Sequence, residues 1–245
     1  MHVGGKIKFN GWKPEDFDAL RNLKDEDGKN VTRLIEKMEE YVSDVHKELL
    51  KHDKFINLEP MLRSKSKFWI NINEPIGSTF HIWGTLGNKD YVRTHSQSNE
   101  GKESPVSIPH FSFALHATHF SIGVLCEGVK PSRKLKDNIR KFPLKFMNIA
   151  QDLDGFEFTI YKREHVEDKE YRCTEKNNFL LGNSLDKHAN EIIINCMNRY
   201  DMCLVYCSKS FNRDDPVLYN QSFIQTSREV MEKLENYYNF CWLGY

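Results

Sequence analysis

The sequence contains no long hydrophobic run. No stretch of its 245 residues approaches the roughly 18 consecutive apolar residues that a membrane-spanning helix requires. The opening residues, 1–6, hold no apolar segment of the kind that a secretory signal carries. We therefore expect a soluble, cytoplasmic chain with no membrane partner.

Net charge is absent as well, because 35 basic residues balance 35 acidic residues. A neutral chain has no overall field that would draw it towards nucleic acid or an anionic surface. Any electrostatic recognition must therefore come from a local patch of charge.

The signature motifs of catalysis are missing too. Neither phosphate-binding glycine loop occurs, and there is no G-x-S-x-G around a nucleophile. The six cysteines form no C-x-x-C pair, and most have apolar neighbours, as Cys126 and Cys207 do. We predict buried free thiols, with disulfides as the alternative for a secreted chain. No cofactor is indicated, and whether the protein is an enzyme stays open.

Histidines are plentiful, and three of them lie close together in the sequence. These are His110, His116 and His119. On a strand, the spacing of His116 and His119 would point their rings to opposite faces, whereas across a tight turn the two rings could converge. Zinc needs three or four ligands, however, and no cysteine or carboxylate pair completes the set at a familiar spacing. We therefore interpret these residues as hydrogen-bonding histidines at the end of a hairpin, and we predict no metal site.

A metal-dependent nuclease would carry an aspartate followed by a strand with Glu-x-Lys. The nearest match is Asp154 with Glu157, but Thr159 stands where the lysine is needed and Lys162 lies further on. The match is poor.

Hydrophobic periodicity predicts an α+β fold. Apolar residues at three- and four-residue spacing indicate helices, and strict alternation indicates strands. The segment 162–176 is almost wholly polar. We expect one domain over residues 1–245, with a mostly antiparallel sheet of five to seven strands flanked by four to six helices. The predicted helices are 14–23, 30–51, 131–141, 143–151, 185–200 and 222–241, and the predicted strands are 6–9, 67–72, 79–84, 111–115, 120–124, 156–161 and 202–207.

The most informative pattern is a basic stretch between Lys130 and Lys145. It contains seven cations and one anion, Asp137, which gives a local charge of +6. On a helix the cations would share the outer face, while Leu135 and Ile139 point inward. A second basic run precedes an aromatic strand. The candidate binding residues are Arg63, Lys65, Lys67, Trp69, Lys130, Arg133, Lys134, Lys136, Arg140 and Lys141.

Several aromatic positions and the order of the elements resemble a conserved-hypothetical prokaryotic domain family of unknown function. The opening Phe9-Asn10-Gly11-Trp12, the long helix after it, the strand from Phe120, and the proline-started basic helix carry this resemblance. The family's Arg-Asp-x-Arg-Phe-Ser segment is replaced here by residues 62–67. The resemblance implies a prokaryotic protein and no particular activity.

These observations favour a non-catalytic module that binds nucleic acid or another polyanion through phosphate contacts. A solvated helix surface would produce the same basic pattern. A metal-dependent hydrolase or nuclease whose site assembles only in the fold is one alternative function, and an interaction subunit of a larger prokaryotic complex is another. The oligomeric state is not indicated.

Overall fold

Seven strands form one sheet in the described part of the computed structural model. The structure describes residues 7–21, 28–52, 55–61, 81–91, 108–166, 170–183, 185, 188–200 and 203–244. The strand order is β1-β2-β3-β4-β7-β5-β6, and the pairs β1–β2, β5–β6 and β5–β7 are antiparallel. The strands are β1 (Leu58–Pro60), β2 (His81–Asn88), β3 (His110–His116), β4 (His119–Glu127), β5 (Glu157–Val166), β6 (Glu170–Leu180) and β7 (Cys203–Asn212).

Besides a helical segment at residues 89–91, six α-helices accompany this sheet within the described residues. The predicted α+β class, with a mostly antiparallel sheet flanked by helices, is confirmed. No helix in the described ranges combines the length and the apolar character needed to cross a membrane. The helices are α1 (Pro14–Arg21), α2 (Gly28–Leu49), α4 (Val129–Lys141), α5 (Pro143–Asp152), α6 (Ala189–Asn198) and α7 (Phe223–Cys241), and a short 3₁₀ helix, η4, covers Pro216–Tyr219.

The chain divides into two compact units, each assembled from three stretches. Unit 1 comprises residues 1–99, 112–122 and 210–231, and unit 2 comprises residues 100–111, 123–209 and 232–245. Strands β3, β4 and β7 and helix α7 contribute residues to both units. That residues 1–245 form a single domain stays a prediction.

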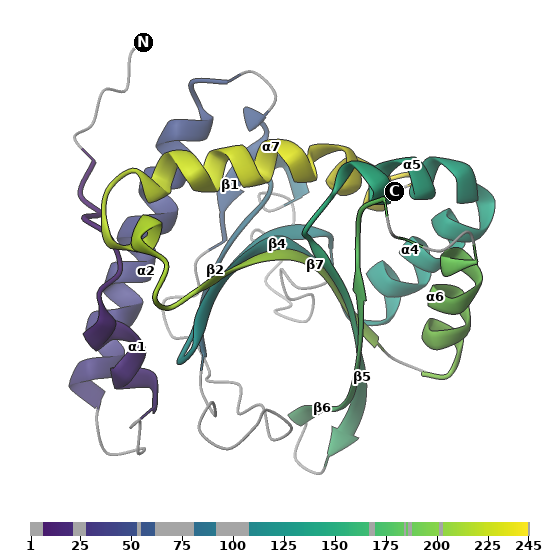
Figure 1. Ribbon diagram of the computed structural model, residues 1–245, viewed down its shortest axis with the longest axis horizontal. Coiled ribbons are helices and arrows are strands. Elements are labelled where there is room, and N and C mark those ends of the chain that lie inside the picture. The colour runs from purple at the N-terminus through teal and green to yellow at the C-terminus, as the bar shows by residue number, and fades with distance from the viewer. Residues whose placement is uncertain are drawn as a thin grey trace. The chain divides into compact units, whose positions relative to one another are not determined.

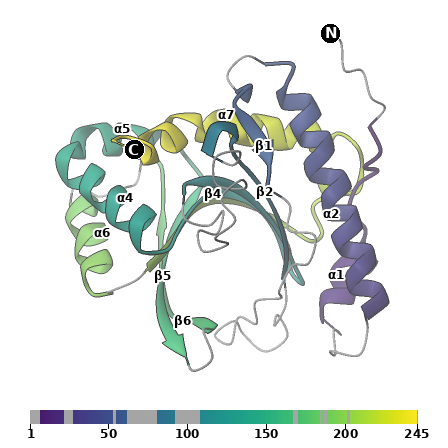
Figure 2. The same cartoon turned by 180° about the vertical axis from the view of Figure 1, so that it is seen from behind.

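Unit 1 is organised around the buried apolar stripe of α2. The two helices α1 and α2 lie side by side in both views (Figures 1 and 2). Tyr41 of α2 is completely buried, and its ring contacts Phe120 of β4 and Phe223 of α7 at centroid distances of 5.2 and 5.7 Å. The ring of Trp12 contacts the same cluster in a tilted orientation, with its centroid 5.3 Å from that of Phe120. The apolar residues of α2 recur at three- and four-residue spacing, which predicts one buried side of the helix, and this aromatic core covers that side.

The strand predicted at 6–9 is not formed, as residues 7–9 are irregular. The backbone N–H groups of Lys8 and Phe9 donate to Asp44 Oδ2 at 2.6 and 2.8 Å, so they are not available to a sheet. Burial raises the pKa of the Asp44 carboxyl, but hydrogen bonds from Lys47, Phe9 and Lys8 outweigh it and leave that pKa below its ordinary value of 3.8. Asp44 therefore anchors this segment to α2 as a carboxylate.

Unit 2 contains a three-helix group and the paired strands β5 and β6. Helices α4, α5 and α6 lie together in both views (Figures 1 and 2) and contact one another. Phe158 of β5 is completely buried, and its ring centroid lies 5.7 Å from that of Phe146 in α5 and 6.1 Å from that of Tyr237 in α7. These ring contacts hold α5 and the end of α7 against the strand.

The polar segment 162–176, which alternation does not identify as a strand, completes β5 and forms most of β6. Strands β5 and β6 pair along their whole length, from Glu157↔Leu180 to Val166↔Glu170. Because β6 stands at the end of the strand order, it does not need the apolar residues that mark a buried strand. The predicted strand 67–72 and the first two residues of the strand 79–84 lie outside the described residues.

Candidate functional site

The basic stretch forms helix α4 and the first turn of α5. Helix α4 starts after Gly128, whose φ of 92° lies in the left-handed region that favours glycine. Ser132 Oγ donates to the Gly128 carbonyl at 2.6 Å, which braces the first turn. The helix ends at Lys141, Phe142 is its C-cap, and Pro143 then begins α5, as the sequence predicts.

One side of α4 is buried and the opposite side is basic. Leu135 and Ile139 are fully buried, as predicted. Asn138, on the same inner side, donates from Nδ2 to the Phe240 carbonyl at 3.0 Å and ties α4 to the end of α7. We call the six cations on the other side the basic face. Its members are Lys130, Arg133, Arg140 and Lys141, which are exposed, and Lys134 and Lys136, which are half-buried.

The remaining candidate binding residues cannot be placed beside this face. Arg63, Lys65, Lys67 and Trp69 fall in residues 62–80, outside the described part of the structure. Within the described ranges, the cations of the basic face come from α4, and Lys145 adds one exposed cation from α5.

The cations of α4 and α5 are largely uncompensated. Among the described residues, no ion pair involves the following cations: Arg133, Lys134, Lys136, Arg140, Lys141 and Lys145. Asp137, the only anion on the helix, is exposed and pairs with none of them. The first turn of α4 also lacks an acidic residue, although the positive end of a helix dipole favours one. The result is a concentrated positive potential.

Two hydrogen bonds fix the corner between α4 and α5 against α6. Arg140 Nη2 donates to Asn198 Oδ1 at 3.0 Å, and Asn190 Nδ2 donates to the Pro143 carbonyl at 3.0 Å. The backbone of Phe142 is held as well, since its N–H donates to the Asn138 carbonyl at 2.8 Å. The side chain of Phe142 nevertheless remains 38% exposed.

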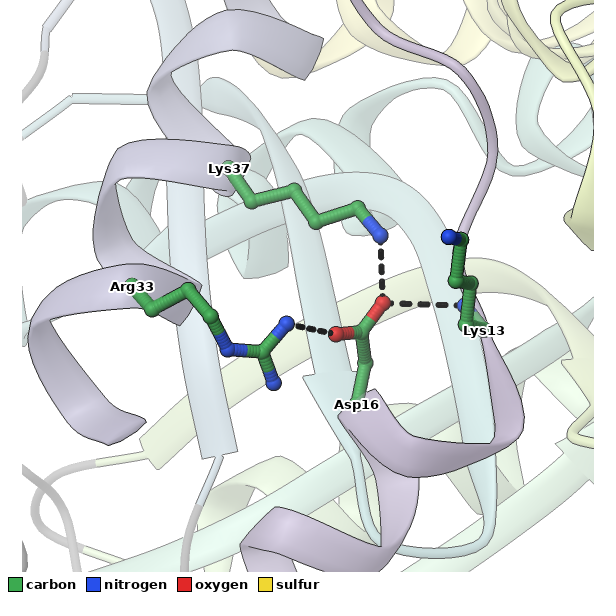
Figure 3. Close-up of polar contacts among 4 residues, drawn as sticks. All are labelled: Lys13, Asp16, Arg33 and Lys37. Carbon is green, nitrogen blue, oxygen red and sulfur yellow. Dashed lines mark hydrogen bonds and ion pairs between the residues drawn. The ribbon is translucent and has the colours of Figure 1, made fainter. Parts of the chain in front are cut away.

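A different arrangement of charge occurs around Asp16 in unit 1 (Figure 3). Its carboxylate is fully buried and accepts from Arg33 Nη1 at 2.6 Å, Lys37 Nζ at 2.5 Å and the Lys13 backbone N–H at 2.9 Å. Lys37 Nζ also lies 5.4 Å from the centroid of the Trp12 ring. Every charge here has a partner, so the cluster joins α1 to α2 and serves structure.

Three histidines come together in unit 1. The rings of His116 and His119 stack across the β3–β4 turn with centroids 4.2 Å apart, which confirms that the turn brings them together. His81 of β2 stacks on His116 at 5.0 Å, and the sequence gives no sign of this third ring because it arrives through strand pairing. Within the described ranges, no group of three or more His, Cys, Asp or Glu residues is arranged to hold a metal ion.

His110 lies apart from this stack and is almost completely buried. Its Nδ1 lies 2.9 Å from the Ile108 carbonyl, and because a carbonyl can only accept, Nδ1 carries the proton. Burial lowers the pKa of His110 to about 4, and the hydrogen bond to Ile108 opposes this only in part. The ring is therefore neutral at physiological pH.

The cysteines are buried free thiols, as predicted, for the five whose surroundings the structure describes. A hydrogen bond with Cys241, together with burial, raises the pKa of the Cys126 thiol well above its ordinary value. Burial does the same to Cys207. Raised pKa values keep these groups protonated and unreactive, which is the opposite of what a nucleophile needs.

The carboxylates of the nuclease-like pattern do not lie in a buried site. Asp154 and Glu157 are both exposed, and Thr159 is buried on the strand where a lysine would be required. Sequence reasoning missed a polar contact elsewhere in unit 2: Tyr200 donates to Glu175 Oε2 at 3.0 Å and accepts from Asn177 Nδ2 at 2.7 Å. Burial and the bond to Glu175 raise the pKa of Tyr200 to about 12.

Comparison with known proteins adds no assignment, since no family model matches the chain and no curated protein matches its sequence. The resemblance to a conserved-hypothetical prokaryotic family stays a prediction.

Proposed function

We propose that the protein is a non-catalytic binding module for nucleic acid or another polyanion, and that the basic face of α4 is its binding surface. The observation that carries this proposal is that five cations of that face take part in no ion pair with a described carboxylate: Arg133, Lys134, Lys136, Arg140 and Lys141. Arg133, Arg140 and Lys141 are exposed, and none pairs with a described carboxylate. A phosphate chain would supply the missing negative charge and release counterions as it binds.

The contrast with other cations of the same chain supports a role beyond solubility. Arg33 and Lys37 meet the buried carboxylate of Asp16, and Arg213 lies 2.8 Å from Asp18. These three cations therefore have carboxylate partners. On α4, by contrast, Arg133, Lys134, Lys136 and Lys141 lie close together without a described carboxylate partner, and a bound polyanion would relieve their mutual repulsion.

The proposal is tested by measuring the affinity for labelled DNA and RNA oligonucleotides over a salt series. The test variant combines Arg133→Glu, Arg140→Glu and Lys141→Glu. We expect its affinity to fall at least tenfold at low salt. If three phosphate contacts are lost, the slope of log K against log salt should shrink by about 2 for a single strand and by about 3 for a duplex.

The matched control reverses three exposed cations elsewhere: Lys29→Glu, Lys176→Glu and Lys233→Glu. It changes the net charge by the same amount and should retain most of the binding. Equal losses of affinity in the two variants would show that net charge alone determines binding. That result would refute a role for the basic face. The absence of any binding by the unmodified protein at low ionic strength would refute the function itself.

A further inference from the structure

Exposed apolar side chains accompany the charge at the basic face. Seven large hydrophobic residues are exposed in the described part of the chain, and three of them fall within the short span 129–145. These three are Val129, 39% exposed, Phe142, 38% exposed, and Leu144, 79% exposed. The last two stand between the exposed cations Lys141 and Lys145.

Phe142 is held in place more firmly than a surface loop residue usually is. Its N–H bonds to the Asn138 carbonyl at 2.8 Å, and its carbonyl accepts from the Phe146 N–H at 3.1 Å. Pro143 follows directly and is tied to α6 through Asn190. The backbone that carries the ring is therefore already ordered before a ligand binds. Binding would then cost little conformational entropy at this corner.

The surroundings of the ring combine π-surface with positive charge. Lys141 Nζ lies 5.4 Å from the centroid of the Phe142 ring, and Arg140 is one residue further back on the same helix end. A cation beside an exposed aromatic ring is the pairing with which proteins hold a phosphate while a base stacks on the ring.

We propose that the ligand of the basic face is a single-stranded nucleic acid, with Phe142 stacking against a base and the neighbouring cations contacting the adjacent phosphates. This inference rests on the proposed function. A duplex keeps its base faces inside the helix and offers an exposed aromatic ring little to contact, whereas a single strand exposes them. Leu144 then packs against the sugar or base of a neighbouring nucleotide.

The test compares the affinities of a 12-nucleotide single strand, as DNA and as RNA, with that of the matching 12-base-pair duplex. The variants are Phe142→Ala and, as a control for lost apolar surface, Ile192→Ala on α6, where the side chain is 50% exposed. We expect Phe142→Ala to weaken single-strand binding about tenfold and to leave duplex binding unchanged. Ile192→Ala should have little effect on either.

Phe142→Trp guards against a simple loss of folding. It keeps an aromatic surface, so it should bind the single strand at least as tightly as the original chain, and its added fluorescence should be quenched by the oligonucleotide. Equal affinity for single strand and duplex, with no effect of Phe142→Ala, would overturn the single-strand inference and leave the basic face as a general polyanion site. Binding to vesicles containing phosphatidylserine, but to neither nucleic acid, would overturn both this inference and the nucleic-acid function.

Discussion

The hydroxyl of Tyr41 lies 2.7 Å from Ser227 Oγ, although the two residues are 186 positions apart in the sequence. Ser227 Oγ also lies 2.5 Å from the Phe223 carbonyl, which can only accept. The serine therefore donates to the carbonyl, and Tyr41 donates to the serine. This buried relay joins α2 to α7 inside unit 1.

Removing the first donor of the relay should destabilise the protein. Tyr41→Phe keeps the ring in the aromatic core but leaves a lone pair of Ser227 without its donor, so we expect a loss of about 1–2 kcal/mol in the free energy of unfolding. Urea denaturation measures it. A double-mutant cycle with Ser227→Ala should give a coupling energy clearly above zero, and strict additivity would contradict the relay.

Loss of the Asp16 charge should lower the free energy of unfolding much more than loss of its partner Arg33. Asp16→Asn leaves Lys37, whose side chain is only 14% exposed, without its counter-charge. We expect a loss of about 3–5 kcal/mol. Arg33 is 47% exposed, so Arg33→Met should cost less than about 1 kcal/mol. Similar losses in the two variants would contradict this division of roles.

The stability of the protein should depend on the protonation of His110. Its pKa is about 4 in the folded chain, against an ordinary value of 6.5, so the unfolded chain binds this proton first. The contribution of neutral His110 to the free energy of unfolding is complete above pH 6.5. It declines as the pH falls to about 4, by about 3 kcal/mol in total.

Urea denaturation at a series of pH values measures this dependence. His110→Asn retains a side-chain donor for the Ile108 carbonyl but cannot take up a proton, so its stability should vary less between pH 7 and 4. An unchanged pH dependence in this variant would show that other groups are responsible.

Thiol reactivity should separate the folded and unfolded states. Of the six cysteines, five are buried and free. We therefore expect Ellman's reagent to modify at most one thiol per chain in the native protein, and all six in concentrated urea. Rapid modification of two or more thiols without denaturant would contradict the buried arrangement.

The orientation of the basic face could be predicted from the sequence because it depends on local periodicity. Leu135 and Ile139 alone determine which side of α4 faces inward, and both are buried as expected. The partner of that helix could not be predicted in the same way. Arg140 meets Asn198 across 58 residues, and no local pattern records such a contact.

The errors at the strands have a similar origin. Alternating apolar residues identify the hairpin strands β3 and β4, whose inner faces are buried, but not β6, which ends the sheet with a polar sequence. The residues around Phe9 are predicted as a strand because strand propensity reflects only the neighbouring residues in the sequence. The carboxylate of Asp44, 35 residues away, takes the N–H that a strand would have used.

The division of the units along the chain bears on how the protein is made. Unit 1 is complete only when residues 210–231 join residues 1–99 and 112–122. A ribosome adds about 5–20 residues per second, so Tyr41 waits on the order of ten seconds for Phe223, the ring that stacks on it. Folding of unit 1 therefore cannot be completed before residues 210–231 have left the ribosome.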